Sequence, residues 1–168
     1  KDEYELAFTK IQKWHKAFPK IDVILGNHDR RVIRLAESVN IPARFIRNYK
    51  DIWKTPKWNW IDNIIYDEIY FVHGDGRTSG MYPAFNLVRK MGMSCVCGHF
   101  HWCGGYKWLV NPLRRMFGLD VGALIDDKAM AFAYGKQAIA RSILGAAVII
   151  DGTPIHIPLP CGRGEKYH

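Results

Sequence analysis

Three short polar clusters in the sequence carry side chains that bind metals or move protons. They are Asn27-His28-Asp29, His73 with Asp75, and His99 with His101. Imidazole nitrogens and an amide oxygen, brought together, suit a borderline divalent ion such as Zn²⁺, Mn²⁺ or Fe²⁺. They suit Ca²⁺ less well, because calcium sites are built from oxygen ligands alone. These residue types therefore predict a metal centre, provided that the fold gathers the three clusters.

Each cluster comes directly after a predicted strand. The three strands are residues 21–25, 69–72 and 93–97, all short runs rich in branched or apolar residues. In open α/β sheets, ligand sites form outside the carboxyl ends of strands, where loops from distant parts of the chain meet. We therefore expect the three clusters to lie at one edge of a sheet.

The remaining elements follow from the spacing of apolar residues. Helical spacing predicts helices over 3–17, 30–39 and 82–90, the second of them capped by Asp29. Residues 64–66 and 69–72 predict a tight hairpin, and Asp151-Gly152 between two β-branched runs predicts another. Further short strands are expected at 107–110, 119–125, 130–134, 146–150 and 155–158.

Helices alternate with strands in the first half of the chain, whereas the second half is mostly strand. This order predicts an α/β fold of layered sheets flanked by helices, in a single domain over 1–168. Residues 48–63 show no clear period and are rich in Trp, Lys and Pro, so we expect an insertion or lid there.

Composition narrows the class of protein. A net charge of +8 over 168 residues favours an anionic partner. No apolar run approaches the roughly 18 residues that cross a bilayer. The four cysteines lack the even spacing of a secreted disulfide scaffold. We therefore expect no membrane association and a soluble cytoplasmic protein with reduced thiols, in the host cytoplasm if the gene belongs to a phage.

Several of these features have a structural alternative. Asn27-His28-Asp29 also fits a turn with a helix cap, and His73-Gly74-Asp75-Gly76 fits a glycine loop. Cysteines at 95, 97 and 103 share a period of two with the histidines at 99 and 101, which fits a structural zinc site unless Gly98 ends the strand. The stretch 50–60 alternates Lys with Trp, which suits base stacking, although tryptophans covering a core edge explain it as well.

The three clusters together resemble a known family. Gly26-Asn27-His28-Asp29, then His73, then Gly98-His99-Phe100-His101 resemble the last three of five signature blocks of the calcineurin-like metallophosphoesterases. The later segment 121–134, with Gly122, Asp126 and Ala131-Phe132-Ala133-Tyr134, is similar to the closing strands of phage and bacterial members. This resemblance implies an αββα sandwich of mixed sheets and hydrolysis of a phosphomonoester or phosphodiester, with nucleic acid among the candidate substrates.

The resemblance also implies a role for each site residue. Two divalent ions (Mn, Fe or Zn) would be bound, the second by Asn27, His73 and His99 and the first by His101. His28 would protonate the leaving alkoxide, and Asp29 would orient His28. Arg30 or Arg31 would contact the substrate phosphate.

Two blocks of the family are missing from this sequence. An Asp-x-His block and a Gly-Asp-x-x-Asp/Asn block would precede Gly26, and neither occurs among the residues before it. We therefore expect a domain that lacks its N-terminal βαβ portion and first strands, with a sheet edge covered by upstream residues, a second copy or another chain. The alternative is a non-catalytic nucleic-acid-binding or assembly protein that keeps the fold.

Overall fold

The computed structural model describes residues 3–125 and 142–159. Its contacts divide the chain into two compact units, Lys1–Asn63 and Ile64–His168. Within the described residues, no helix combines the length and the apolar character needed to cross a bilayer.

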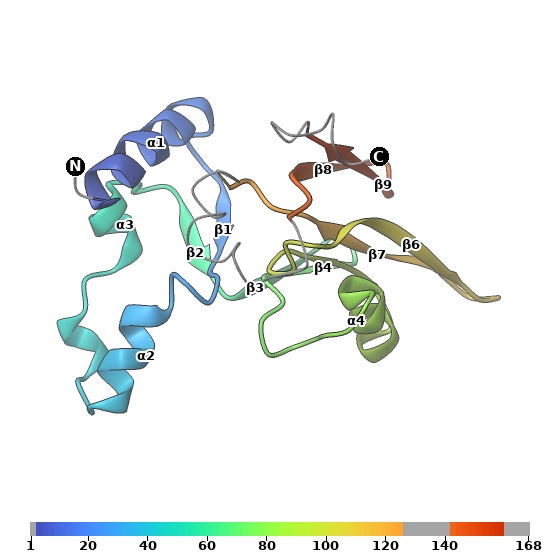
Figure 1. The fold of residues 1–168 in the computed structure, drawn as a ribbon, viewed down its shortest axis with the longest axis horizontal. Helices are drawn as coiled ribbons and strands as arrows, with labels where there is room; N and C mark the ends of the chain where they lie inside the picture. The colour runs from blue at the N-terminus through green and yellow to red at the C-terminus, as the bar shows by residue number, and fades with distance from the viewer. Residues whose placement is uncertain (1–2, 126–141, 160–168) are drawn as a thin grey trace. The chain divides into compact units, whose positions relative to one another are not determined.

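Unit 1 combines helices with a two-stranded parallel sheet (Figure 1). Its elements are α1 (Glu3–Ala17), β1 (Asp22–Ile24), α2 (Arg31–Ser38), the 3₁₀ helix η1 (Ala43–Phe45), α3 (Tyr49–Trp53) and β2 (Asn59–Ile61). Strands β1 and β2 pair in parallel, with Val23 opposite Trp60. Helix α1 has the predicted bounds, and β1 and α2 lie within the predicted segments.

The segment 48–63, where we expected an insertion or lid, is part of unit 1 and contains regular elements. It contains α3 and β2. Trp58 is only 4% exposed, and its Nε1 donates to the carbonyl of Phe18 over 2.8 Å. The Trp60 ring stacks on Tyr49 at 5.2 Å. These tryptophans therefore hold unit 1 together, which confirms the core-edge interpretation of the Lys/Trp stretch.

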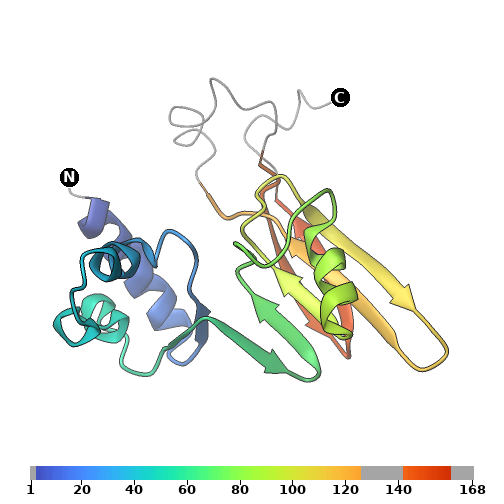
Figure 2. The same ribbon diagram turned by 90° about the horizontal axis from the view of Figure 1, so that it is seen from below.

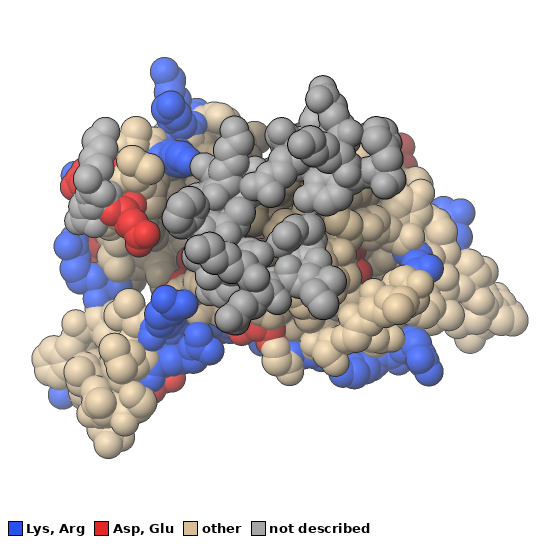
Figure 3. Space-filling model, in the orientation of Figure 1, with Lys and Arg blue, Asp and Glu red and all other residues tan. Residues whose placement is uncertain are grey.

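Helix α1 is attached to α3 by aromatic and polar contacts. The Tyr4 ring stacks on Trp53 with centroids 5.4 Å apart, and the Tyr4 hydroxyl donates to the carbonyl of Ile52. Gln12 donates to the carbonyl of Trp53 over 2.6 Å. By contrast, α2 and η1 expose several apolar side chains, and Figure 3 shows this end of unit 1 mostly in the colour of uncharged residues. The exposed side chains are Val32, Leu35, Val39, Ile41 and Phe45.

Unit 2 contains a five-stranded mixed sheet in the order β3-β4-β5-β7-β6. Strands β4, β5 and β7 run parallel to one another, and β6 is antiparallel to β7. A separate hairpin, β8–β9, is antiparallel. The elements are β3 (Asn63–Tyr66), β4 (Ile69–Val72), α4 (Pro83–Met91), β5 (Ser94–Cys97), β6 (Gly104–Val110), β7 (Arg115–Val121), β8 (Gly145–Ile150) and β9 (Thr153–Pro158).

The two faces of this sheet have different covers. Helix α4 packs on one face, through Ala84, Leu87 and Val88. The β8–β9 hairpin packs on the other face, where Ala147 and Ile149 meet a cluster that contains Phe117. Figures 1 and 2 show α4 and the hairpin on opposite sides of the sheet. The layers within unit 2, together with the helices and strands of unit 1, confirm the predicted α/β fold.

Two tight turns explain why the hairpins were predictable. Asp67 and Glu68 both have positive φ, 48° and 60°, and Asp151 and Gly152 have φ of 49° and 71°. Two-residue hairpin turns of this hand require positive φ at both central residues. The strand expected at 130–134 lies outside the described residues. So does most of the segment 121–134, which resembles the closing strands of the family.

Candidate metal and phosphate site

The histidines at 73 and 99 leave neighbouring strands at the same edge of the sheet. Val72, the last residue of β4, pairs with Cys97, the last residue of β5, in a parallel ladder. The loops that follow therefore start side by side. Nδ1 of His99 lies 3.2 Å from Nε2 of His73, and the ring centroids are 5.0 Å apart. The structure thus brings together two of the predicted metal ligands.

The loop that carries His99 has a strained backbone. His99 has φ of 63°, and the N–H of Phe100 donates to the carbonyl of Gly98 over 2.6 Å, which closes a three-residue γ-turn. Positive φ at a non-glycine residue costs about 1–3 kcal/mol and persists where the surroundings enforce it. Here Phe100 is buried in the core beneath α4 and meets the His99 ring edge-on at 4.9 Å.

The spacing of the two imidazole nitrogens fits a shared metal ion. Two nitrogens each about 2.0–2.1 Å from one ion lie about 2.9 Å apart at an octahedral angle and about 3.4 Å apart at a tetrahedral one. The observed 3.2 Å falls within that range. Two neutral rings joined by a hydrogen bond have a similar nitrogen–nitrogen distance. A measurement of metal binding therefore distinguishes a metal-binding pair from a hydrogen-bonded pair.

Asn27 and His101 are the other two predicted ligands. No group of three or more His, Cys, Asp or Glu with metal-binding geometry occurs among the described residues. Asn27 belongs to unit 1, in the loop after β1. The carbonyl of His101 accepts from the N–H of Ile143 over 2.7 Å, which ties this loop to the segment before β8. The histidine pair is therefore the part of the predicted site that unit 2 brings together.

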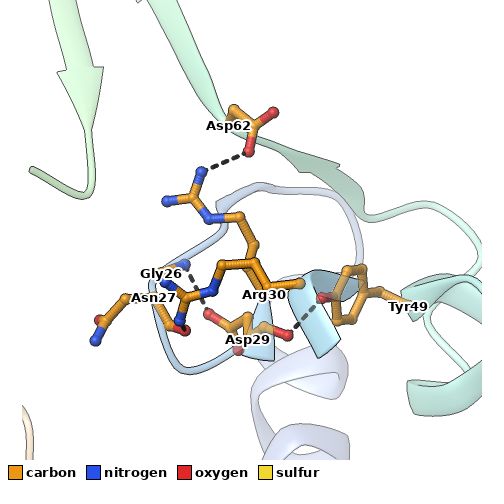
Figure 4. A network of polar contacts seen from close by, with 7 residues as sticks. Gly26, Asn27, Asp29, Arg30, Tyr49 and Asp62 are labelled. Atoms are coloured by element: carbon orange, nitrogen blue, oxygen red, sulfur yellow. Dashed lines mark hydrogen bonds and ion pairs between the residues drawn. The ribbon is translucent and has the colours of Figure 1, made fainter. Parts of the chain in front are cut away.

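In unit 1, the loop after β1 is closed by its own aspartate (Figure 4). Oδ2 of Asp29 accepts from the N–H of Gly26 over 2.8 Å, and the Tyr49 hydroxyl donates to the Asp29 carbonyl over 2.7 Å. The prediction that Asp29 caps the next helix is wrong. Helix α2 has Arg30 at its N-cap, without a side-chain cap bond. The carboxylate serves the turn instead.

The same loop gathers three arginines. Nη2 of Arg31 lies 3.3 Å from Nδ1 of His28, and Arg34 donates to the carbonyl of Asn27 over 2.8 Å. Arg30 forms an ion pair with Asp62 at 3.0 Å (Figure 4). The guanidinium beside the predicted general acid is therefore that of Arg31, whereas Arg30 is engaged by a carboxylate. The family resemblance implies that Asp29 orients His28. The side chain beside Nδ1 of His28 is that of Arg31, and the Asp29 carboxylate accepts from the N–H of Gly26.

The cysteines lie in a setting that keeps their thiols protonated. Cys95 and Cys97 are buried in the core beneath α4. Burial raises the pKa of Cys95 to about 12, and burial together with the nearby Asp120 carboxylate raises the pKa of Cys97 further. Strand β5 ends at Cys97, so the histidines that follow do not continue its face. Among the described residues, no group of three or more His, Cys, Asp or Glu brings these cysteines together into a possible zinc site.

One buried carboxylate escaped the sequence analysis. Asp120 on β7 is 8% exposed, and its two oxygens lie 3.2 and 3.3 Å from the N–H of Ala84 at the start of α4. Cys97 Sγ donates to Oδ1 over 3.1 Å. Burial raises the pKa of Asp120, against the opposing effect of these two hydrogen bonds. The sequence feature that could have revealed Asp120 is an acidic residue within an otherwise apolar strand.

Comparison with known proteins adds no relative to this picture. No family model, curated protein or solved structure matches the chain. The likeness to calcineurin-like metallophosphoesterases therefore depends on the three residue blocks alone.

Proposed function

We propose that this protein is a metal-dependent phosphoesterase of the calcineurin-like type. The observation that carries the proposal is the pair of imidazoles from His73 and His99, whose facing nitrogens are 3.2 Å apart at the carboxyl ends of two parallel strands. A strained γ-turn holds one member of the pair. Strain of this kind concentrates at functional sites.

In this proposal, His73 and His99 hold a divalent ion, with Asn27 as a further ligand and His101 on a second ion. When bound, such ions activate water and neutralise the charge that builds on phosphoryl oxygens. Manganese, iron and zinc all accept imidazole nitrogen. The metal-binding part of the proposal can be tested without any substrate.

His28 is the proposed proton donor to the leaving alkoxide oxygen. As an imidazolium, His28 would give one ring proton to the leaving alkoxide and be left as a neutral imidazole, while Arg31, whose Nη2 lies 3.3 Å from Nδ1 of His28, stays positively charged. Arg31 also supplies a positive charge for the substrate phosphate, since arginine binds phosphate through paired N–H donors. Asp29 acts through the loop that it closes.

The substrate class is a phosphomonoester or phosphodiester. The net charge of +8 favours polyanionic substrates, including nucleic acid. It equally favours the second candidate, a nucleic-acid-binding or assembly protein without catalysis. Trp58 and Trp60 give neither function extra support, because Trp58 is buried in unit 1 and Trp60 stacks on Tyr49 there.

Turnover distinguishes the two candidates. The full-length product of the gene is assayed with bis-p-nitrophenyl phosphate and p-nitrophenyl phosphate in Mn²⁺, beside His28→Ala, His99→Ala and the control His15→Ala on α1. We expect His28→Ala to retain metal and to lose about a hundredfold or more in rate. His99→Ala should lose both metal and turnover, and His15→Ala neither. Hydrolysis that survives EDTA, or equal rates in all four proteins, would refute the proposal.

A further inference from the structure

Unit 2 contains a pocket of about 370 Å³ on the α4 side of β6 and β7. It lies where β7 ends, at the same edge of the sheet at which β4 and β5 deliver the two histidines. Residues that line it include Tyr82, Phe85, Trp102, Lys107, Gly118 and Asp120. None of these residues has a role in the phosphoesterase reaction that we propose.

The walls of the pocket are aromatic and partly exposed. Tyr82 is 45% exposed and Trp102 is 51% exposed. Nζ of Lys107 lies 4.1 Å from the centroid of the Tyr82 ring, which fixes that ring by a cation–π contact. Trp102 meets the buried Phe100 edge-on at 5.6 Å. Rings held in this way offer flat apolar faces on which another aromatic ring can stack.

The polar group of the pocket is a carboxylate. Gly105 pairs with Asp120 across β6 and β7, and a side chain at Gly105 would point into open space, so nothing at this position covers the carboxylate. The two oxygens of a carboxylate accept about four hydrogen bonds in total. Ala84 and Cys97 supply two donors. Asp120 therefore retains capacity for donors on a ligand.

We propose that this pocket binds a nucleobase that carries an exocyclic amino group. The base would stack on Trp102 and Tyr82, and its amino group would donate to Asp120. Cytosine, adenine and guanine offer such donors, whereas uracil flanks its single N–H with carbonyl oxygens that a carboxylate repels. Lys107 would face the phosphate or sugar that accompanies the base.

The position of Trp102 connects this pocket with the proposed chemistry. Trp102 follows His101 directly, so a base stacked on it lies beside the loop that carries the metal ligands. The substrates would then be nucleotide phosphoesters. That assignment of substrates rests on the proposed phosphoesterase function, whereas binding of the base does not.

Calorimetry in EDTA measures base binding without any contribution from metal. The full-length protein is titrated with cytidine, adenosine, guanosine, uridine and ribose. We expect the three amino-bearing nucleosides to bind, uridine to bind at least about tenfold more weakly, and ribose not to bind. We expect Trp102→Leu to bind these nucleosides about tenfold or more weakly, because it loses the stacking of the base on the indole ring.

Trp14→Leu on α1 is the matched control, since Trp14 is 53% exposed and lies in unit 1. It should bind nucleosides as the wild type does. Asp120→Asn should reduce the preference for cytidine over uridine, because an amide both donates and accepts. The pocket assignment is overturned if no nucleoside binds, or if Trp102→Leu and Trp14→Leu bind equally.

The two proposals fail separately. Nucleoside binding in EDTA by a protein that hydrolyses no phosphoester with Mn²⁺ would support the pocket and refute the phosphoesterase. Metal-dependent hydrolysis by a protein that binds no nucleoside would refute the pocket and leave the phosphoesterase standing.

Discussion

His99 adopts a backbone conformation that only glycine reaches without strain. Its φ of 63° places it at the centre of the γ-turn between Gly98 and Phe100. The His99 ring that this turn carries lies beside His73, with 3.2 Å between Nδ1 of His99 and Nε2 of His73. A fold without need of that contact would gain stability from glycine at this position.

Substitution of His99 separates this strain from the function of the ring. Both His99→Gly and His99→Ala remove the imidazole, but only glycine relieves the backbone. We expect His99→Gly to be more stable than His99→Ala by about 1 kcal/mol in urea unfolding with EDTA present. Equal stability of the two variants, or greater stability of the alanine variant, would show that the turn carries no strain.

Thiol reactivity tests the environment of the cysteines. Cys95 and Cys97 are buried and their pKa values are raised, so few thiolates form at pH 8 and iodoacetamide has no access. Cys103 is half-buried with a raised pKa and should react slowly, yet faster than the other two. Mass spectrometry of native and unfolded protein after alkylation measures this order. Labelling of Cys97 as fast as Cys103 in the native protein would contradict it.

Asp120 should make stability depend on pH. Because its pKa is raised above the ordinary value of about 3.9, the native state keeps the proton to higher pH than the unfolded chain does. Its contribution to stability is therefore greatest in acid and is lost as the pH rises through the native pKa. Asp120→Asn lacks this effect.

Urea unfolding in EDTA at several pH values measures the Asp120 contribution. The free energy of unfolding of the wild type, minus that of Asp120→Asn, should fall as the pH rises from about 4. A difference that is constant or that grows with pH would mean that burial does not raise the pKa of this carboxyl.

The candidate site shows what spacing could and could not predict for single residues. His73 and His99 are 26 positions apart, and their approach depends on the parallel pairing of β4 with β5, which no local pattern specifies. We predicted His73 and His99 as metal ligands from the family resemblance and from their positions at the ends of strands. Asp120 was missed because its partners, Ala84 and Cys97, are distant in sequence.

At the scale of elements, the prediction succeeded where the pattern was long or the turn was distinctive. Helix α1 spans Glu3–Ala17 as predicted, because fifteen residues show several turns of apolar spacing. It failed for α3, with five residues, and for β2, with three, because such short elements show no period. Strand β7 begins at Arg115 rather than 119, since arginine and Gly118 resemble turn residues.

The contact between α4 and β7 depends on one glycine. A Cβ at Gly118 would lie 2.6 Å from the carbonyl carbon of Ala84 and would also overlap the backbone nitrogen of Phe85. Backbone atoms of a helix cannot move away alone, so Gly118→Ala should cost about 2 kcal/mol or more. Gly98→Ala is the control, because its Cβ would meet neighbours at ordinary distances of 3.8 Å or more. Urea unfolding should show a clear loss for Gly118→Ala alone, and equal effects would refute this account of the packing.

At the scale of the whole molecule, we propose that the net charge favours anionic substrates and that side chains in the loops supply the chemistry. A net charge of +8 attracts anions over distances near the Debye length, about 8 Å at physiological salt, without selecting among them. In this proposal, selection among anions depends on Arg31 and His28 in unit 1 and on the histidine pair in unit 2. The central claim is that this pair binds a metal ion.

The most direct test measures metal content and hydrolysis in the same samples. Full-length wild type, His73→Ala, His99→Ala and His15→Ala are loaded with Mn²⁺, freed of unbound metal by gel filtration, and analysed for metal and for cleavage of bis-p-nitrophenyl phosphate. Our account predicts that the wild type and His15→Ala retain metal and activity, and that His73→Ala and His99→Ala lose both. Equal metal content in all four proteins, or none in the wild type, would contradict it.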